Sequence, residues 1–160
     1  MDGLIVFLAA YLIYAVVLMV VFTWYRIERW REFTAAVFLT GITALILAKL
    51  AEAIYFHPRP FVSQNIQPLV PHAADNGFPS EHTVWAMTLT SLLYFYRRRL
   101  AVVAFVLTLL VGAGRVWAHV HSWSDILGGL IIGAIAGYAG VKLARLVSGR
   151  LSAKPPKARR

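Results

Sequence analysis

The stretch GRVWAHVHSWSD, residues 114–125, places Arg115, His121 and Asp125 between two long apolar runs. Because His121 and Asp125 are four residues apart, on a helix they share a face, and the carboxylate can accept a proton from one ring nitrogen of the histidine. The other ring nitrogen then keeps a free lone pair. A histidine oriented by a carboxylate is typical of a covalent nucleophile toward phosphorus, whereas a lone interfacial histidine is ordinarily only a polar surface residue.

Two earlier segments, HPRPF (57–61) and NGFPSEH (76–82), hold further candidates. Ser80 follows a loop and precedes an apolar helical run, so it is suited to cap a helix that begins there. The free amide hydrogens at that helix end, together with the dipole, attract anions such as phosphate. The alternative is that Ser80 is only a helix cap and that Glu81 merely favours the dipole.

Two arginines supply the positive charge that such a site needs. Arg59 and Arg115 can each hold phosphate oxygens with two donors and together stabilise the negative charge of a transition state. The alternative for Arg59 is an ion pair with Asp75 or Glu81. Pairing with Asp125 is the alternative for Arg115, although an unpaired arginine near the end of an apolar span is costly and needs a reason to be there.

These motifs, in this order, resemble those of the type 2 phosphatidic acid phosphatase (PAP2) superfamily. Its usual pattern is K-x6-R-P, then P-S-G-H, then S-R-x5-H-x3-D; the matching residues here are Arg59-Pro60, Pro79-Ser80-Glu81-His82, Arg115, His121 and Asp125. The resemblance runs from about residue 49 to residue 125. Within the superfamily, HPRPF and HAADNGFPSEH look most like the bacterial undecaprenyl-pyrophosphate phosphatases.

The resemblance implies a reaction and a role for each catalytic residue. His121 attacks phosphorus to give a phosphohistidine, Asp125 orients it, and His82 protonates the leaving group. The implied substrate is a polyprenyl (undecaprenyl) pyrophosphate, which is hydrolysed to the monophosphate. A phosphatidylglycerophosphate or phosphatidate phosphatase is the second candidate.

The resemblance further implies that Arg59, Arg115 and Ser80, with nearby backbone amides, bind the phosphoryl oxygens and that no metal or other cofactor is needed. Five histidines and several carboxylates make a metal site the natural rival, yet the sequence contains no H-x3-H or H-E-x-x-H spacing. We therefore expect a cofactor-free enzyme.

The sequence departs from the family pattern at three positions. Gly114 replaces the serine before the arginine, and Glu81 replaces the glycine of P-S-G-H and adds negative charge near an anionic substrate. Glu52 stands where the family lysine belongs, and Lys49 lies one helical turn deeper. Lys49 either reaches the phosphate or pairs with Glu52 inside the membrane, and the pairing is the favoured alternative; Glu52 is then a structural partner or a sensor of substrate charge.

The same two residues also allow an interpretation as a different class of protein. Lys49 and Glu52 could form an ion or proton relay in a small transporter subunit. Such a relay needs a continuous polar path, and no other span supplies a further buried acid or base to extend it. The enzyme reading is therefore preferred.

Membrane helices are the elements that must position these residues. The chain of 160 residues is 59% hydrophobic, well above a soluble domain, and candidate membrane spans fall near 4–23, 33–56, 82–96, 100–118 and 126–147, of which the third is short. We expect an all-α integral membrane bundle of about five helices (1–147), with a tight hairpin between the third and fourth, followed by a polybasic tail (148–160). The net charge of +9 does not indicate nucleic acid, because the charges gather at the ends of apolar runs.

The positions of the basic residues predict the orientation in the membrane. All but three of the 16 lysines and arginines lie in 26–31, 97–99 and 142–160, which are alternate loops and hence one side. The positive-inside rule makes this side cytoplasmic, so that the N-terminus and the candidate site lie outside, in a bacterial inner membrane. Gly129, Gly133 and Gly137 recur every four residues and predict close packing of the last span against another helix. The sequence does not indicate an oligomeric state.

Overall fold

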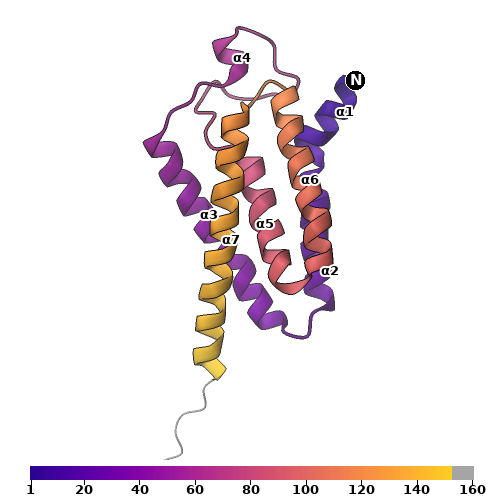
Figure 1. The fold of residues 1–160 in the computed structure, drawn as a ribbon, viewed down its shortest axis with the longest axis vertical. Helices are drawn as coiled ribbons and strands as arrows, with labels where there is room; N and C mark the ends of the chain where they lie inside the picture. Colours follow the sequence, from indigo (N-terminus) through magenta and orange to yellow (C-terminus); the bar gives the residue numbers. More distant parts are fainter. Residues whose placement is uncertain (153–160) are drawn as a thin grey trace, which may run out of the picture.

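The computed structural model describes residues 1–152, with side-chain environments for residues 1–148, and these residues form a helical bundle (Figure 1). They contain no β-strand, so the all-α prediction is confirmed. The elements are α1 (Asp2–Val6), η1 (Phe7–Tyr11), α2 (Ile13–Arg26), α3 (Trp30–Ile54), α4 (Pro60–Ser63), α5 (Glu81–Tyr96), α6 (Arg98–Trp117) and α7 (Trp123–Ser152).

Four of the five predicted spans are long and apolar enough to cross a membrane. These are the run Asp2–Arg26, which contains a π-helical turn in η1, then α3, α6 and the part of α7 from Trp123 to Ser148. With 16 residues, α5 is shorter than the rest and packs against α2, α3, α6 and α7 in the bundle. Only Arg97 separates α5 from α6, as the predicted tight hairpin requires.

The end of α7 differs from the predicted boundary. The helix continues to Ser152, five residues beyond the predicted end of the span, and Gly149 within this stretch does not end it. The polybasic tail predicted for 148–160 therefore begins as helix, and its residues 153–160 lie outside the described part of the chain.

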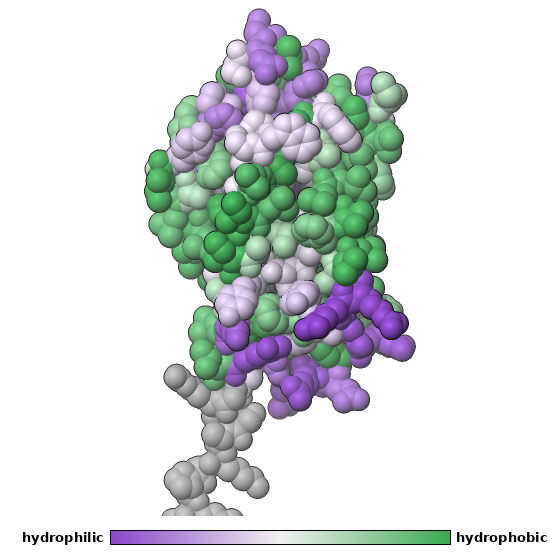
Figure 2. Space-filling model, viewed as in Figure 1, coloured by the Kyte–Doolittle hydropathy of each residue, from purple (hydrophilic) through white to green (hydrophobic). Residues whose placement is uncertain are grey.

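Polar and apolar surfaces divide the molecule into three zones. Figure 2 shows a broad apolar belt around the middle and hydrophilic residues at both ends. The N-terminus and α4 lie at one end, whereas the α2–α3 and α5–α6 connections and the end of α7 lie at the other (Figure 1). The two connections that hold the candidate catalytic residues thus meet at the same end as the N-terminus, as predicted.

The predicted glycine contact lies between α7 and α5. A Cβ on Gly133 would come within 2.6 Å of the carbonyl oxygen of Val84, and one on Gly137 would overlap the side chain of Ser91. Gly129 is equally close to α5. The two backbones therefore approach to a distance that only glycine allows, which confirms the packing role.

Replacing Gly133 with alanine is expected to lower the thermal stability of the bundle in detergent, by roughly 1–3 kcal/mol, because the new methyl group overlaps backbone that cannot move away. Gly41→Ala is the matched control, since a Cβ there meets only Trp85 at an ordinary 3.8 Å. That control is expected to be neutral or stabilising by up to about 1 kcal/mol. Equal melting temperatures for the two variants would contradict the close contact.

Candidate active site

Backbone hydrogen bonds join the long connection between α3 and α5 to the short connection between α6 and α7. Phe61 N–H donates to the carbonyl of His119 (3.1 Å), and Leu69 N–H donates to that of Ala118 (3.1 Å). The N–H of Ser80 donates to the carbonyl of Asp125 (3.2 Å). Residues far apart in the sequence are thereby brought into one buried cluster.

His121 lies outside the helices, in the connection between the predicted spans 100–118 and 126–147, so it shares no helical face with Asp125. It belongs to the connection that ends at Ser122, because Ser122 and Asp125 form a reciprocal cap at the start of α7. The Asp125 carboxylate accepts the N–H of Ser122 (2.7 Å), and the N–H of Asp125 points to the Ser122 hydroxyl (3.4 Å). The S-x-x-D pattern at 122–125 is the sequence signal that could have placed the helix start here.

Two hydrogen bonds decide which nitrogen of His121 carries the proton. Nε2 lies 3.2 Å from Nη1 of Arg59, and an arginine can only donate, so Nε2 is the acceptor. Nδ1 therefore carries the hydrogen and donates it to the carbonyl of Gly77 at 2.8 Å. His121 is 2% exposed, and the lone pair of its unprotonated Nε2 accepts a hydrogen bond from the Arg59 guanidinium.

The partner of Nδ1 differs from the predicted one. Asp125 Oδ2 lies 3.6 Å from Nδ1 of His121, beyond the length of a hydrogen bond, and the Gly77 carbonyl takes its place. Asp125 Oδ1 instead accepts a hydrogen bond from Nδ1 of His57 at 2.8 Å. The carboxylate is close enough to stabilise a positive charge on the ring, while the carbonyl of Gly77 accepts the hydrogen of Nδ1.

Arg59 is buried next to His121 and also makes the ion pair that was its alternative role. Its Nε donates to Asp75 (2.7 Å), and its Nη1 donates to the carbonyl of Val120 (3.0 Å) as well as to His121. Pro60 at the first position of α4 begins the short helix immediately after it. The guanidinium is thus held rigidly beside the nucleophilic nitrogen.

Arg115 is 3% exposed and makes no ion pair with a carboxylate among the described residues. The pairing with Asp125 considered as its alternative is therefore absent. Nη1 donates to the carbonyl of Ala9 (3.4 Å), Nη2 donates to Nε2 of His72, and the buried Nε has no hydrogen-bond partner. An unsatisfied cationic donor in a buried position favours the binding of an anion.

The packing of the bundle explains why Gly114 stands in place of the family serine. A Cβ at this position would come within 2.8 Å of the backbone of Ala9 in η1. The first helix therefore lies too close for any side chain here, and the same approach brings the Ala9 carbonyl to Arg115.

Ser80 and His82 stand at the start of α5. Ser80 is the N-cap residue, as predicted, but its side chain makes no capping hydrogen bond; its Oγ accepts the hydroxyl of Thr83 instead (3.1 Å). His82 is half-buried in the first turn, and Glu81 is exposed. Ser80 is fully buried, so the first turn of α5 presents its free amides at the site end of the bundle.

Lys49 and Glu52 form the ion pair that was favoured from the sequence. Lys49 Nζ lies 2.6 Å from Glu52 Oε2, and both side chains are exposed on α3. Asn76 Nδ2 donates to the backbone carbonyl of Glu52 (3.1 Å), which ties the end of α3 to the turn before α5. A role for Lys49 in binding phosphate, and one for Glu52 or Glu81 in sensing charge, remain predictions.

Two histidines that the sequence did not single out belong to the cluster. His57 contacts Asp125, and the ring of His72 lies edge-on to that of His121 with centroids 5.9 Å apart. His57 lies within the HPRPF motif, two residues before Arg59, which is a signal that could have included it. His72 carries no such signal, because its contact with Arg115 depends on the path of the long connection.

Burial and neighbouring charges shift the pKa values of three loop residues. Burial, followed by the charges of Arg59 and Arg115, lowers the pKa of His72 to about 4, so this ring is neutral at pH 7 and accepts from Arg115. Burial lowers the pKa of His121, against the opposing effect of Asp125. Burial raises the pKa of Asp75, but the hydrogen bond and charge of Arg59 outweigh it and leave that pKa lowered.

A comparison with known protein families shows which family the chain belongs to. The sequence pattern of the PAP2 superfamily matches residues 30–147. The chain belongs to the PAP2 superfamily. It is 34% identical over 139 residues to the undecaprenyl-diphosphatase BcrC of Bacillus subtilis (strain 168), covering 86% of this chain and 72% of that protein.

Two solved structures share the fold. The crystal structure of Aquifex aeolicus LpxE superposes with a TM-score of 0.72 at 24% identity and covers 88% of this chain and 85% of the other. That of a transmembrane PAP2 type phosphatidylglycerolphosphate phosphatase from Bacillus subtilis has a TM-score of 0.61 at 22% identity and covers 96% of this chain and 77% of the other. The protein is thus a multi-pass membrane phosphatase of this superfamily.

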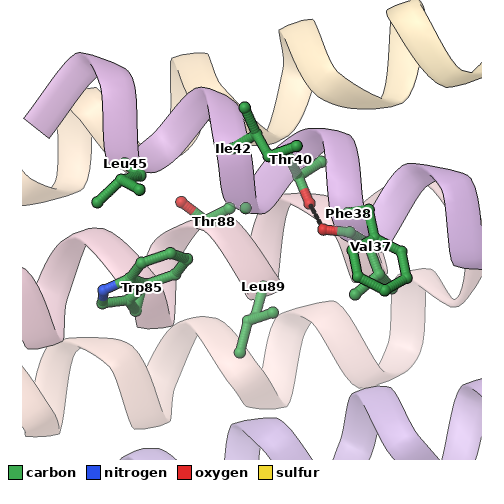
Figure 3. Close-up of a pocket in the computed structure, with 9 residues that line it drawn as sticks. Val37, Phe38, Thr40, Ile42, Leu45, Trp85, Thr88 and Leu89 are labelled. Atoms are coloured by element: carbon green, nitrogen blue, oxygen red, sulfur yellow. Dashed lines mark hydrogen bonds between the residues drawn. The ribbon is translucent and has the colours of Figure 1, made fainter.

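An apolar groove lies between α3 and α5 of the PAP2 bundle, on the membrane side of the site. Its volume is about 360 Å³, and Figure 3 shows Trp85 and Leu89 of α5 opposite Phe38 and Leu45 of α3. Trp85 lies one helical turn from His82.

The tautomer of His121 can be tested directly. In ¹⁵N spectra of histidine-labelled protein in detergent at pH 7, the His121 ring is expected to be neutral, with Nδ1 protonated and Nε2 unprotonated. Because its pKa is lowered from 6.5, protonation on acidification should occur below pH 6.5. His121→Gln assigns the signals. A proton on Nε2 at pH 7, or a midpoint above 6.5, would contradict the hydrogen bonds described.

Proposed function

We propose that this phosphatase hydrolyses a polyprenyl diphosphate, such as undecaprenyl diphosphate, to the monophosphate through a phosphohistidine on His121. The observation that carries the proposal is the unprotonated Nε2 of a buried histidine 3.2 Å from Nη1 of Arg59. This contact supports the roles proposed here, His121 as the nucleophile and Arg59 beside it as a phosphate ligand. The 34% identity to an undecaprenyl-diphosphatase supports the choice of substrate.

In the first step, Nε2 of His121 attacks the terminal phosphorus. The N–P bond forms as the bond from that phosphorus to the bridging oxygen breaks, and the lipid monophosphate leaves with the electron pair of the broken bond. His82 gives its proton to the leaving oxygen. The phosphorylated ring becomes positively charged, and the Asp125 carboxylate, 3.6 Å from Nδ1, stabilises that charge.

In the second step, water attacks the phosphohistidine. His82, which now has a free lone pair, removes a proton from the water, and the electron pair of the P–N bond returns to Nε2. Inorganic phosphate leaves and the resting state is restored. Arg59, Arg115 and the amides at the start of α5 hold the phosphoryl oxygens through both steps, with Ser80 among them.

The two arginines supply the positive charge that a metal ion supplies in many other phosphatases, so we propose that the reaction needs no metal. No group of three or more His, Asp or Glu side chains in residues 1–152 is arranged to hold one. The groove between α3 and α5 is lined mainly by apolar side chains, which suit a lipid chain better than a soluble phosphate ester.

Phosphate release in detergent tests the catalytic residues. His121→Ala is expected to lose at least about 1,000-fold in kcat because the covalent step is lost. His82→Ala should lose about 100- to 10,000-fold because the acid and base are lost. His119→Asn is the control, since this exposed histidine of the same connection has φ 61°, a conformation that asparagine tolerates. Acid-labile ³²P on the wild type but not on His121→Ala would support the phosphohistidine; turnover by His121→Ala would contradict it.

The same assay distinguishes the substrates. With EDTA present, undecaprenyl diphosphate is expected to be hydrolysed with a higher kcat/KM than phosphatidylglycerophosphate or phosphatidate. A preference for either phospholipid would overturn the choice of substrate and leave the mechanism intact. Loss of activity in EDTA that a divalent ion restores would instead revive a metal-dependent mechanism.

We further propose that the site faces the extracytoplasmic side of a bacterial membrane. The basic residues of the α2–α3 and α5–α6 connections lie at the opposite end of the bundle from the site (Figure 1), and the positive-inside rule assigns that end to the cytoplasm. The N-terminus then lies outside. A phosphatase in this orientation acts on lipid in the outer leaflet of that membrane.

Single cysteines test the orientation without background, because the chain has no cysteine of its own. Gln64→Cys, in the exposed connection near the site, is expected to react with a membrane-impermeant thiol reagent in intact cells. Glu28→Cys, between α2 and α3, should react only after the membrane is permeabilised. The reverse pattern would place the active site in the cytoplasm.

A further inference from the structure

The Asp125 carboxylate lies beside two histidines, His57 and His121, and only His121 is the proposed nucleophile. The carboxylate is fully buried. Its Oδ1 accepts the hydrogen of His57 Nδ1 at 2.8 Å, and its Oδ2 accepts the N–H of Ser122 at 2.7 Å and lies 3.6 Å from His121 Nδ1. Because a carboxylate only accepts, the proton in the contact with His57 lies on Nδ1 of that ring.

The fold holds His57 as firmly as it holds the nucleophile. The backbone N–H of His57 donates to the side chain of Asn76 (2.9 Å), and its carbonyl accepts the N–H of Gly77 (2.8 Å). Its ring stacks on that of Tyr55, with centroids 6.0 Å apart and planes 16° apart. The turn that presents the Gly77 carbonyl to His121 therefore also fixes the donor of Asp125.

We infer that His57 is a positioning residue for phosphoryl transfer, an inference that rests on the proposed function. Its Nδ1–H holds Oδ1 of Asp125, so that Oδ2 stays directed toward His121. Without this donor the carboxylate is held only at Oδ2, by the N–H of Ser122, and it loses one of the hydrogen bonds that keep it ionised in a buried position. The positive charge that develops on His121 during phosphorylation would then be poorly stabilised.

Three substitutions separate the possible roles of His57. An asparagine places an amide N–H close to the position of Nδ1, whereas a glutamine places its amide near that of Nε2. We expect His57→Ala to lower kcat on the order of 10- to 100-fold, from the loss of a hydrogen bond to a buried charge, with little change in KM. His57→Asn should recover most of this loss, and His57→Gln should not.

Other results would overturn the inference. Rescue by glutamine together with a raised KM would mean that Nε2 of His57 binds the substrate. Equal losses in all three variants, accompanied by lower melting temperatures, would mean a purely structural role. In an Asp125→Asn background, His57→Ala should cost little more, because the carboxylate that it positions is gone; fully additive losses would contradict the coupling.

The comparison of variants is made with whichever phosphate ester the wild type hydrolyses fastest, so it does not depend on the choice of lipid. A measurement that needs no turnover complements the kinetics. The ¹⁵N signals of the His121 ring should shift in His57→Ala and return to their wild-type positions in His57→Asn. Failure of the wild type to form a phosphohistidine would overturn the proposed function alone. Unchanged His121 signals in His57→Ala would overturn the role of His57 alone.

Discussion

The hydrogen bond from Nδ1 of His121 to the carbonyl of Gly77 determines which ring nitrogen is left unprotonated, and the turn around Gly77 is tied to the rest of the bundle. Asn76, the preceding residue, accepts the N–H groups of His57 and Phe78 and donates to the carbonyls at the end of α3. One asparagine side chain thus joins a membrane helix to the turn that orients the nucleophile. A Cβ on Gly77 would lie 3.0 Å from the His57 carbonyl oxygen, so a side chain at this position would crowd the turn.

Charge is distributed unequally over the site, and the inequality fits an anionic substrate. Arg59 has Asp75 as a partner, whereas Arg115 is buried with an unpartnered Nε and only neutral acceptors around it. A buried cation without a counterion destabilises the free protein, and a phosphate group would relieve that cost on binding. Arg115, a buried charge without a counterion, therefore lies where the phosphate of the substrate is proposed to bind.

The sequence predicted which residues come together in the site better than it predicted how they contact one another. Arg59, Ser80, Arg115, His121 and Asp125 do converge, because alternate connections of a membrane bundle lie on the same side. The four-residue spacing of His121 and Asp125 did not reveal their geometry, since Ser122 and Asp125 cap α7 and His121 lies before it. His57 and His72 were missed because their contacts depend on the path of a connection of some 25 residues, in which no periodic pattern constrains the backbone.

What the sequence by itself determined is a helical membrane phosphatase with its basic loops at one end and its reactive residues at the other, because the length and polarity of each run depend only on local composition. The four-residue repeat of glycines likewise predicted close packing of α7. Only the tertiary structure decided that α5 is its partner, that Gly77 rather than Asp125 directs His121, and that His57 holds Asp125. Each of these depends on distances between atoms that are distant in the chain, and no spacing along the sequence encodes them.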